Sequence, residues 1–125
     1  MIVTNIESGV AITTPEPSVR HVRVLLSPLM QEGLEDFAVG YTEMPPGENG
    51  SLHKHLLSAE IWLFFKGNGR ATVGGEEIEI RPGVVVYTPR DTYHQVFNTG
   101  DEAIQLYYLY VPAGEEKEII DGRFR

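Results

Sequence analysis

Apolar residues occur along this chain in short segments with turn residues between them. Thirteen glycines and eight prolines separate stretches rich in Val, Ile, Tyr and Phe, which is typical of a protein built from many strands. No segment keeps an apolar period of 3.6 residues for more than about two turns, so we expect an all-β fold with little helix. The predicted strands are 10–13, 20–27, 36–44, 52–55, 61–66, 70–73, 77–80, 84–88, 94–98 and 103–111.

Two predicted strands are apolar or aromatic on both faces. They contain residues 61–65, Ile-Trp-Leu-Phe-Phe, and residues 106–110, Leu-Tyr-Tyr-Leu-Tyr. An antiparallel sheet with one face in water would alternate instead. A second layer or another subunit is therefore expected to cover the outer side.

Three histidines and one glutamate provide the candidate chemistry. Because residues two apart on a strand point to the same side, His53 and His55 are expected to project together. Glu60 follows after a short turn and can face them, and His94 opens a later strand after Pro89. Imidazole and carboxylate ligands together suit divalent Fe, Mn, Ni, Cu or Zn. We therefore predict that these four side chains bind one divalent transition metal ion per subunit.

The two segments that carry these residues resemble the cupin motifs. The first motif is matched by Gly47, His53, His55, Glu60 and Gly67 at the family's spacing. The second is matched by Gly83, Pro89, His94 and Asn98, but Asp91 stands where the family usually has glycine. Aspartate tolerates left-handed backbone better than most residues, so we expect the turn to survive.

This resemblance implies a small single-domain bacterial cupin of the RmlC-like superfamily. It implies a double-stranded β-helix, or jelly-roll barrel, with a metal inside, and often a homodimer whose barrels pack back to back. One domain over residues 1–125 is expected, with the core barrel at about 36–112. The strands apolar on both faces agree with such a dimer.

Composition narrows the partners. Ten Lys and Arg against eighteen Asp and Glu give a net charge of −8, and no basic cluster is present to bind phosphates, so nucleic acid is not expected. The chain has no cysteine, which excludes disulfides and thiolate ligands. With no signal-like start and no long apolar run, we expect a cytoplasmic protein without membrane contact.

Several other residues are weaker candidates. Trp62, Phe64 and Tyr87 could shape a substrate cavity, although a packing role fits each equally well. Tyr108 and Tyr110 are interpreted as core or dimer surface rather than acids, and Asn98 as a structural hydrogen-bonding residue. His21 and Arg23 lie opposite an apolar stripe, on a solvated or interface face unless one reaches the pocket.

Two segments are not explained by a barrel. Residues 29–36 form a polar excursion that could act as a lid, and residues 115–125 are interpreted as a docked tail or frayed terminus.

The ligand set leaves the function open. A metalloenzyme acting on a small oxygenated substrate is favoured, with dioxygenase-type chemistry ahead of a decarboxylase, lyase or sugar or keto-acid isomerase. This order rests on finding no convincing second His or Glu in the pocket. The alternative is a non-catalytic protein that binds a small ligand. A purely structural role is disfavoured, because four such side chains inside a barrel would cost stability without an ion.

Overall fold

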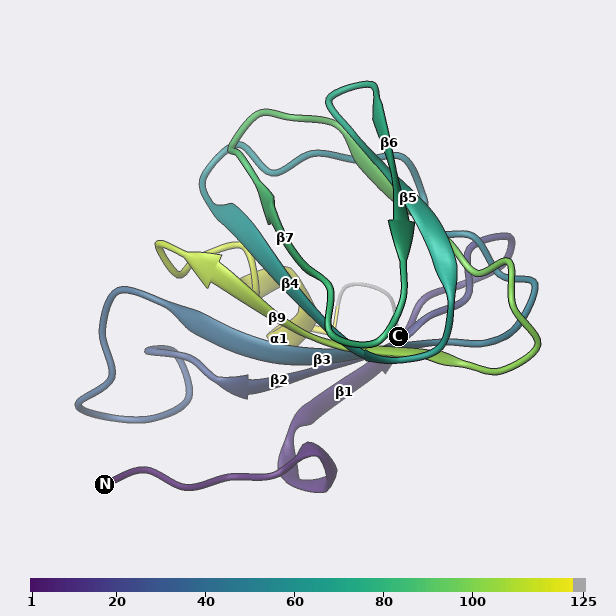
Figure 1. Ribbon diagram of the computed structural model, residues 1–125. Coiled ribbons are helices and arrows are strands. Elements are labelled where there is room, and N and C mark those ends of the chain that lie inside the picture. The colour runs from purple at the N-terminus through teal and green to yellow at the C-terminus, as the bar shows by residue number, and fades with distance from the viewer. Residues whose placement is uncertain (123–125) are drawn as a thin grey trace.

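The computed structural model describes residues 1–122, which form two facing β-sheets with little helix (Figure 1). The predicted all-β jelly roll is confirmed. The strands are β1 (Val10–Thr13), β2 (His21–Leu26), β3 (Ala38–Met44), β4 (Ala59–Lys66), β5 (Gly69–Val73), β6 (Glu76–Ile80), β7 (Val85–Thr88), β8 (His94–Phe97) and β9 (Ile104–Val111). The helices are a 3₁₀ turn η1 (Ile6–Ser8) and α1 (Lys117–Ile120).

The sheets differ in size. One has six strands in the order β1-β2-β3-β9-β4-β7, and the other has three in the order β6-β5-β8. All neighbouring strands are antiparallel. Figure 1 looks along the barrel, with β5 and β6 on one side and the larger sheet opposite. Since β1 and β2 belong to the six-stranded sheet, residues before the expected core of 36–112 also line the interior.

The inner face of the large sheet is built by cross-strand pairs. Trp62 on β4 lies opposite Tyr108 on β9, and Phe64 lies opposite Leu106. All four side chains are at most 4% exposed. Burial of side chains of this size is the main stabilising term of such a core.

Tyr108 crosses the inner face of β3 at Gly40. A Cβ atom at Gly40 would collide with the Tyr108 ring, and the ring's hydroxyl donates a hydrogen bond to the carbonyl of Arg23 at 3.1 Å. Gly40 is therefore required by close approach, since only glycine leaves room for the ring.

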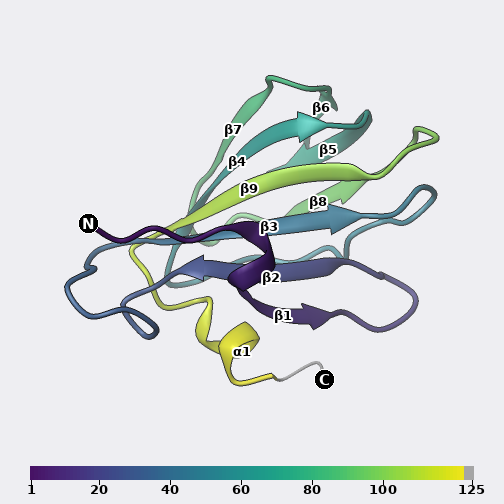
Figure 2. The same ribbon diagram turned by 90° about the horizontal axis from the view of Figure 1, so that it is seen from below.

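One short helix closes an end of the large sheet. α1 packs against β1 and β2, and its Ile119 is buried (Figure 2). The tail before it is anchored by Glu116, which is fully buried and accepts a hydrogen bond from Ser27 Oγ at 2.6 Å. Docking is therefore the correct interpretation for residues 115–122, whereas residues 123–125 lie outside the described part.

α1, four residues long, is far too short to cross a membrane, and no other helix of residues 1–122 is long and apolar enough to do so.

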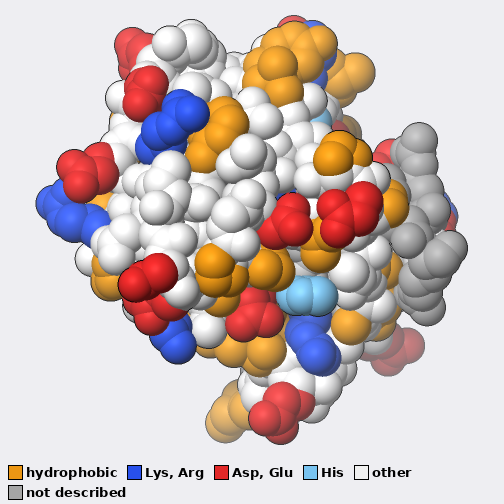
Figure 3. Space-filling view, turned by 90° about the vertical axis from the view of Figure 1, so that its right-hand side faces the viewer, with side chains coloured by type: hydrophobic (Ala, Val, Ile, Leu, Met, Phe, Trp, Pro, Cys, Tyr) orange, Lys and Arg blue, Asp and Glu red, His pale blue; other side chains and the backbone are white. Residues whose placement is uncertain are grey.

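Charge is dispersed on the face of the molecule that Figure 3 shows. Figure 3 shows one face on which acidic, basic and apolar side chains are interspersed, without a continuous basic area among the coloured residues. The concentrated group of titratable side chains lies in the interior instead.

Candidate metal centre

His53 and His55 lie in the connection between β3 and β4. The predicted strand 52–55 is wrong, because only one isolated bridge forms there, between His53 and His94. His53 N donates to His94 O at 3.2 Å, and His94 N donates to His53 O at 2.8 Å. The chain before His94 is not a strand, and it passes through a turn at residues 90 and 91.

That turn is the one in which Asp91 replaces the usual glycine. Asp91 has φ 55°, in the left-handed region, so the expectation that the turn survives is confirmed. Its N–H donates to the carbonyl of His55 at 2.7 Å, and its carboxylate pairs with Lys54 Nζ at 2.7 Å. The two motif segments are thereby fastened to each other next to the histidines.

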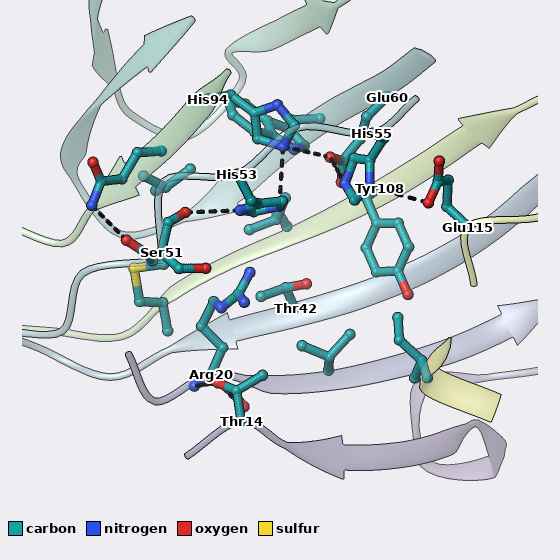
Figure 4. Close-up of a pocket in the computed structure, with 18 of the residues that line it drawn as sticks. Thr14, Arg20, Thr42, Ser51, His53, His55, Glu60, His94, Tyr108 and Glu115 are labelled. Atoms are coloured by element: carbon teal, nitrogen blue, oxygen red, sulfur yellow. Dashed lines mark hydrogen bonds and ion pairs between the residues drawn. The ribbon is translucent and has the colours of Figure 1, made fainter. Parts of the chain in front are cut away.

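The four predicted ligands converge in the barrel (Figure 4). One donor atom from each of His53, His55, Glu60 and His94 lies within 4.8 Å of every other. Glu60 Oε1 is 3.4 Å from His55 Nε2 and 3.3 Å from His94 Nε2. His94 Nε2 is also 3.2 Å from His53 Nε2. Glu60 comes from the start of β4 and His94 from the start of β8, so the two sheets meet at this cluster.

Hydrogen bonding fixes the tautomers of two rings. His53 Nδ1 lies 2.8 Å from the carbonyl of Ser51, and His94 Nδ1 lies 3.1 Å from the carbonyl of Thr92. A carbonyl can only accept, so both Nδ1 atoms carry the proton and both Nε2 atoms present lone pairs to the centre. Two lone pairs facing each other at 3.2 Å repel unless a cation lies near them.

The third ring also fits a cation. His55 Nε2 is buried and has no hydrogen-bond partner within residues 1–122, although Glu60 Oε1 lies 3.4 Å from it. A buried polar atom without a partner is costly unless something absent from the polypeptide binds it. The donor set of three imidazoles and one carboxylate suits a divalent transition metal.

The protonation states follow from the same contacts. Burial raises the pKa of Glu60, but contacts with His55 and His94 outweigh burial and bring it to about 2. Burial and the neighbouring His94 lower the pKa of His53 to about 4. At neutral pH Glu60 is therefore a carboxylate and His53 a neutral imidazole, as ligation requires.

His55 behaves differently. Burial lowers its pKa, but the carboxylates of Glu60 and Glu115 outweigh burial, so its pKa lies above the ordinary 6.5. A proton on His55 competes with a metal ion for the same ring. His55 is thus the ligand whose protonation limits metal binding.

We therefore expect metal affinity to fall as the pH falls. Affinity should be full above the raised pKa of His55 and should drop by roughly tenfold per pH unit below it, since one proton must leave for each ion bound. His53 should add no further loss until the pH nears 4. Equilibrium dialysis at fixed free Zn²⁺ from pH 8 to pH 5 measures this, and a constant occupancy would refute the assignment.

A cavity of about 280 Å³ opens beside the four ligands. Trp62, Tyr108 and Tyr110 line this cavity. The two tyrosines are also buried in the core, as expected. Phe64 is buried in the core and is not among the lining side chains. Tyr87 is 64% exposed on the outer side of β7, away from the cavity.

The remaining candidates lie elsewhere. His21 is exposed and bonds Thr13 Oγ1 at 3.0 Å, and Arg23 reaches the carbonyl of Glu7, so both lie outside this cavity. Asn98 donates to the carbonyls of Met44 and Glu102, both at 2.9 Å, which confirms a structural role. No side chain of the expected lid, residues 29–36, lines the cavity.

Sequence reasoning missed an acid at the site. Glu115 lines the cavity, and its Oε2 lies 3.6 Å from His55 Nδ1 while its Oε1 accepts a hydrogen bond from Leu57 N at 2.8 Å. Carboxylates that orient a ligating histidine through its other nitrogen are common at metal sites. The expectation of no convincing second His or Glu in the pocket is therefore wrong, since Glu115 and Glu118 both line the cavity. No local signal in the sequence marks a tail residue as part of a barrel site.

Arg20 was missed as well. It precedes β2, on the same side as the inward-facing Val22, and it lines the cavity. Thr14 binds it on both sides, because Arg20 N donates to Thr14 Oγ1 at 2.8 Å and Thr14 N donates to Arg20 O at 2.9 Å. The signal was available, because an arginine at the end of an apolar stripe on a strand points inward.

Known proteins share this fold. The chain is 29% identical over 102 residues to an uncharacterized protein of Methanocaldococcus jannaschii, covering 80% of this chain and 81% of the relative. It is 34% identical over 89 residues to the dimethylsulfoniopropionate lyase DddW of Ruegeria pomeroyi, covering 71% of this chain. It is 32% identical over 64 residues, 51% of this chain, to an oxalate-binding protein of Thermotoga maritima. The chain spans only 56% and 53% of the length of the last two relatives.

Solved structures agree on the architecture. A Thermotoga maritima protein described as a predicted oxalate decarboxylase superposes with a TM-score of 0.77 at 21% identity, covering 90% of this chain and all of the other. KdgF from Halomonas superposes with a TM-score of 0.74 at 16% identity, covering 93% of this chain and 97% of the other. The cupin domain family matches residues 40–116, which include all four candidate ligands, and the chain belongs to that family.

Proposed function

We propose that this cupin is a metalloenzyme acting on a small oxygenated substrate at one divalent ion, which can be Fe, Mn, Ni, Cu or Zn. The ion would be held by His53, His55, Glu60 and His94. One observation carries the proposal: one donor atom from each of three imidazoles and one carboxylate lies within 4.8 Å of the others, and the buried His55 Nε2 among them has no hydrogen-bond partner within residues 1–122. When bound, such an ion polarises an oxygen ligand of the substrate.

The chain's own residues would prepare the reaction. Glu115 orients His55 through Nδ1, and the carbonyls of Ser51 and Thr92 do the same for His53 and His94. Trp62 and Tyr110 form apolar walls of the cavity beside the ligands. A cavity of about 280 Å³ accepts only a small molecule, which would be held between these walls.

Among reaction classes, we favour non-oxidative chemistry by a lyase, decarboxylase or isomerase. The Glu115 carboxylate at the cavity wall offers a group that can accept or donate a proton beside the ligands. Similarity to a lyase supports the same class, whereas similarity to an oxalate-binding protein supports the binding of a small acid without specifying a reaction. Dioxygenase-type chemistry is the second candidate, favoured because four protein ligands leave two octahedral positions open.

Anaerobic turnover separates these candidates. Protein loaded with each of the five metals would be assayed with and without oxygen against keto acids, oxalate, dimethylsulfoniopropionate, diketones and catechols. We expect metal-dependent turnover that persists without oxygen. Turnover only with oxygen consumed would favour the dioxygenase, and saturable binding without turnover would favour a ligand-binding protein.

We also propose a homodimer through the outer face of β3, β9, β4 and β7. Tyr41, Phe65 and Tyr107 form an aromatic cluster there, in which the rings of Phe65 and Tyr107 stack at 5.1 Å. Nearby Val85 and Tyr87 are 63% and 64% exposed. An apolar sheet face of this kind is typical of an interaction surface.

The dimer is tested by sedimentation at micromolar concentration. Wild-type protein should sediment at twice 14.0 kDa, and Val85→Glu should give the monomer, because a charge would be buried at the contact. Glu79→Ala on the other sheet is the control and should remain dimeric. A wild-type monomer would remove this proposal.

A further inference from the structure

Arg20 is the feature that the metal centre does not explain. Its Nε atom is buried without a hydrogen-bond partner within residues 1–122. The ion pairs of this part of the chain involve Lys54, His55, Arg70, His94 and Lys117, and Arg20 forms none. A partly buried guanidinium without an anion is unfavourable, so an anion from outside the chain would stabilise it.

The direction of the side chain connects it to the ligands. Figure 4 shows the Arg20 guanidinium pointing from the side of the cavity near Thr14 toward His53. The backbone of Arg20 is fixed by its two hydrogen bonds with Thr14. The preceding residue is bound to the connection between β3 and β4, because Val19 N donates to Glu48 Oε2 at 3.3 Å. The guanidinium is therefore held facing the candidate metal centre across the cavity.

The other charged side chains lining the cavity have partners. Lys54 pairs with Asp91 at 2.7 Å, and Glu115 contacts His55 and the N–H of Leu57. Glu60 belongs to the proposed ligand set, and Glu118, which also lines the cavity, is not without a partner. Among the described residues that line the cavity, Arg20 is thus the positively charged side chain that forms no ion pair, so its charge is available to a ligand.

From this arrangement, and resting on the function proposed above, we infer that Arg20 binds a carboxylate group of the substrate. The substrate class would be small carboxylic acids, with one oxygen-bearing group at the metal ion and a carboxylate on the guanidinium. Arginine suits this role because its planar fork matches a carboxylate with two parallel hydrogen bonds. Arg20 would select acids over neutral analogues of the same size.

Calorimetry with zinc-loaded protein tests this inference. The probes are oxalate, malonate and succinate, which span three lengths, and the corresponding neutral diamides. We expect at least one dicarboxylate to bind and its diamide not to bind. Arg20→Gln should weaken that binding by roughly 10- to 100-fold, Arg20→Lys by less, and Arg23→Gln, on the outer face, not at all.

Zinc stoichiometry and melting temperature keep the outcomes distinct. Arg20→Gln should still bind one zinc ion, and it should melt no lower than wild type, because it removes a charge without a partner. Equal dicarboxylate binding by Arg20→Gln, binding of diamides as tight as acids, or no binding of any dicarboxylate would overturn the role of Arg20. A lower melting temperature for Arg20→Gln with unchanged binding would make Arg20 structural. Failure of the wild type to take up zinc would overturn the metal centre itself.

Discussion

His55→Ala should lower the affinity of the protein for a divalent ion by at least about 100-fold. Residues that only orient a ligand are worth 10- to 100-fold in metal affinity, so a ligand itself should be worth more. His55 is suited to this test because its Nε2 is buried without a hydrogen-bond partner within residues 1–122, so the ring has an atom that a metal ion would bind. Zinc titration followed by calorimetry measures the loss.

His21→Ala is the matched control. His21 lies on the outer face and contacts Thr13, so its removal should leave metal affinity unchanged. An equal loss in both variants would show that metal binds to histidines in general and not at the barrel site. Unfolding curves of both variants without metal exclude a trivial loss of the fold.

Gly40→Ala should destabilise the protein by roughly 2–4 kcal/mol, at or somewhat above the usual cost of overpacking a core. The added Cβ would occupy the position of the Tyr108 ring, which is 2% exposed and hydrogen-bonded to Arg23 O. The ring must move, and both the core and the cavity wall that it forms would be disturbed. Urea unfolding measures the change in free energy.

Gly50→Ala provides the comparison for Gly40→Ala. A Cβ at Gly50 would meet its nearest atoms, Met44 Cε and Val96 O, at 3.4 Å, so little stability should be lost. If Gly40→Ala unfolded at the same urea concentration as Gly50→Ala, the Tyr108 ring could not be packed against Gly40 of β3 as described.

The strands were largely predictable because turn chemistry and short apolar segments mark them directly. Nine of the ten predicted strands correspond to β1–β9, with ends shifted by at most two residues. The failure at 52–55 is physical: the segment forms one isolated β-bridge, between His53 and His94, and next meets the turn at Asp91 instead of a strand, which no sequence pattern shows. The two histidines nevertheless converge, although the strand geometry that led to this expectation is absent.

The ligand group could be predicted because its spacing is local within each motif. Glu115 lies after the motifs and has no signal in the sequence, whereas Arg20 could be predicted to point inward but not to lie at the site, because it comes before the motifs. They meet the centre only through the β1–β2 hairpin and the docking of α1. Residue chemistry identifies candidates, but the tertiary contacts that select among them are set by packing.

The central claim is that one cation is held by these four side chains. A crystal structure of zinc-soaked protein with anomalous scattering tests it most directly. We predict a single strong peak inside the barrel, about 2.0–2.2 Å from Nε2 of His53, His55 and His94 and from a carboxylate oxygen of Glu60. A strong peak bound elsewhere, or an empty cluster whose donors stay apart at saturating zinc, would contradict the account.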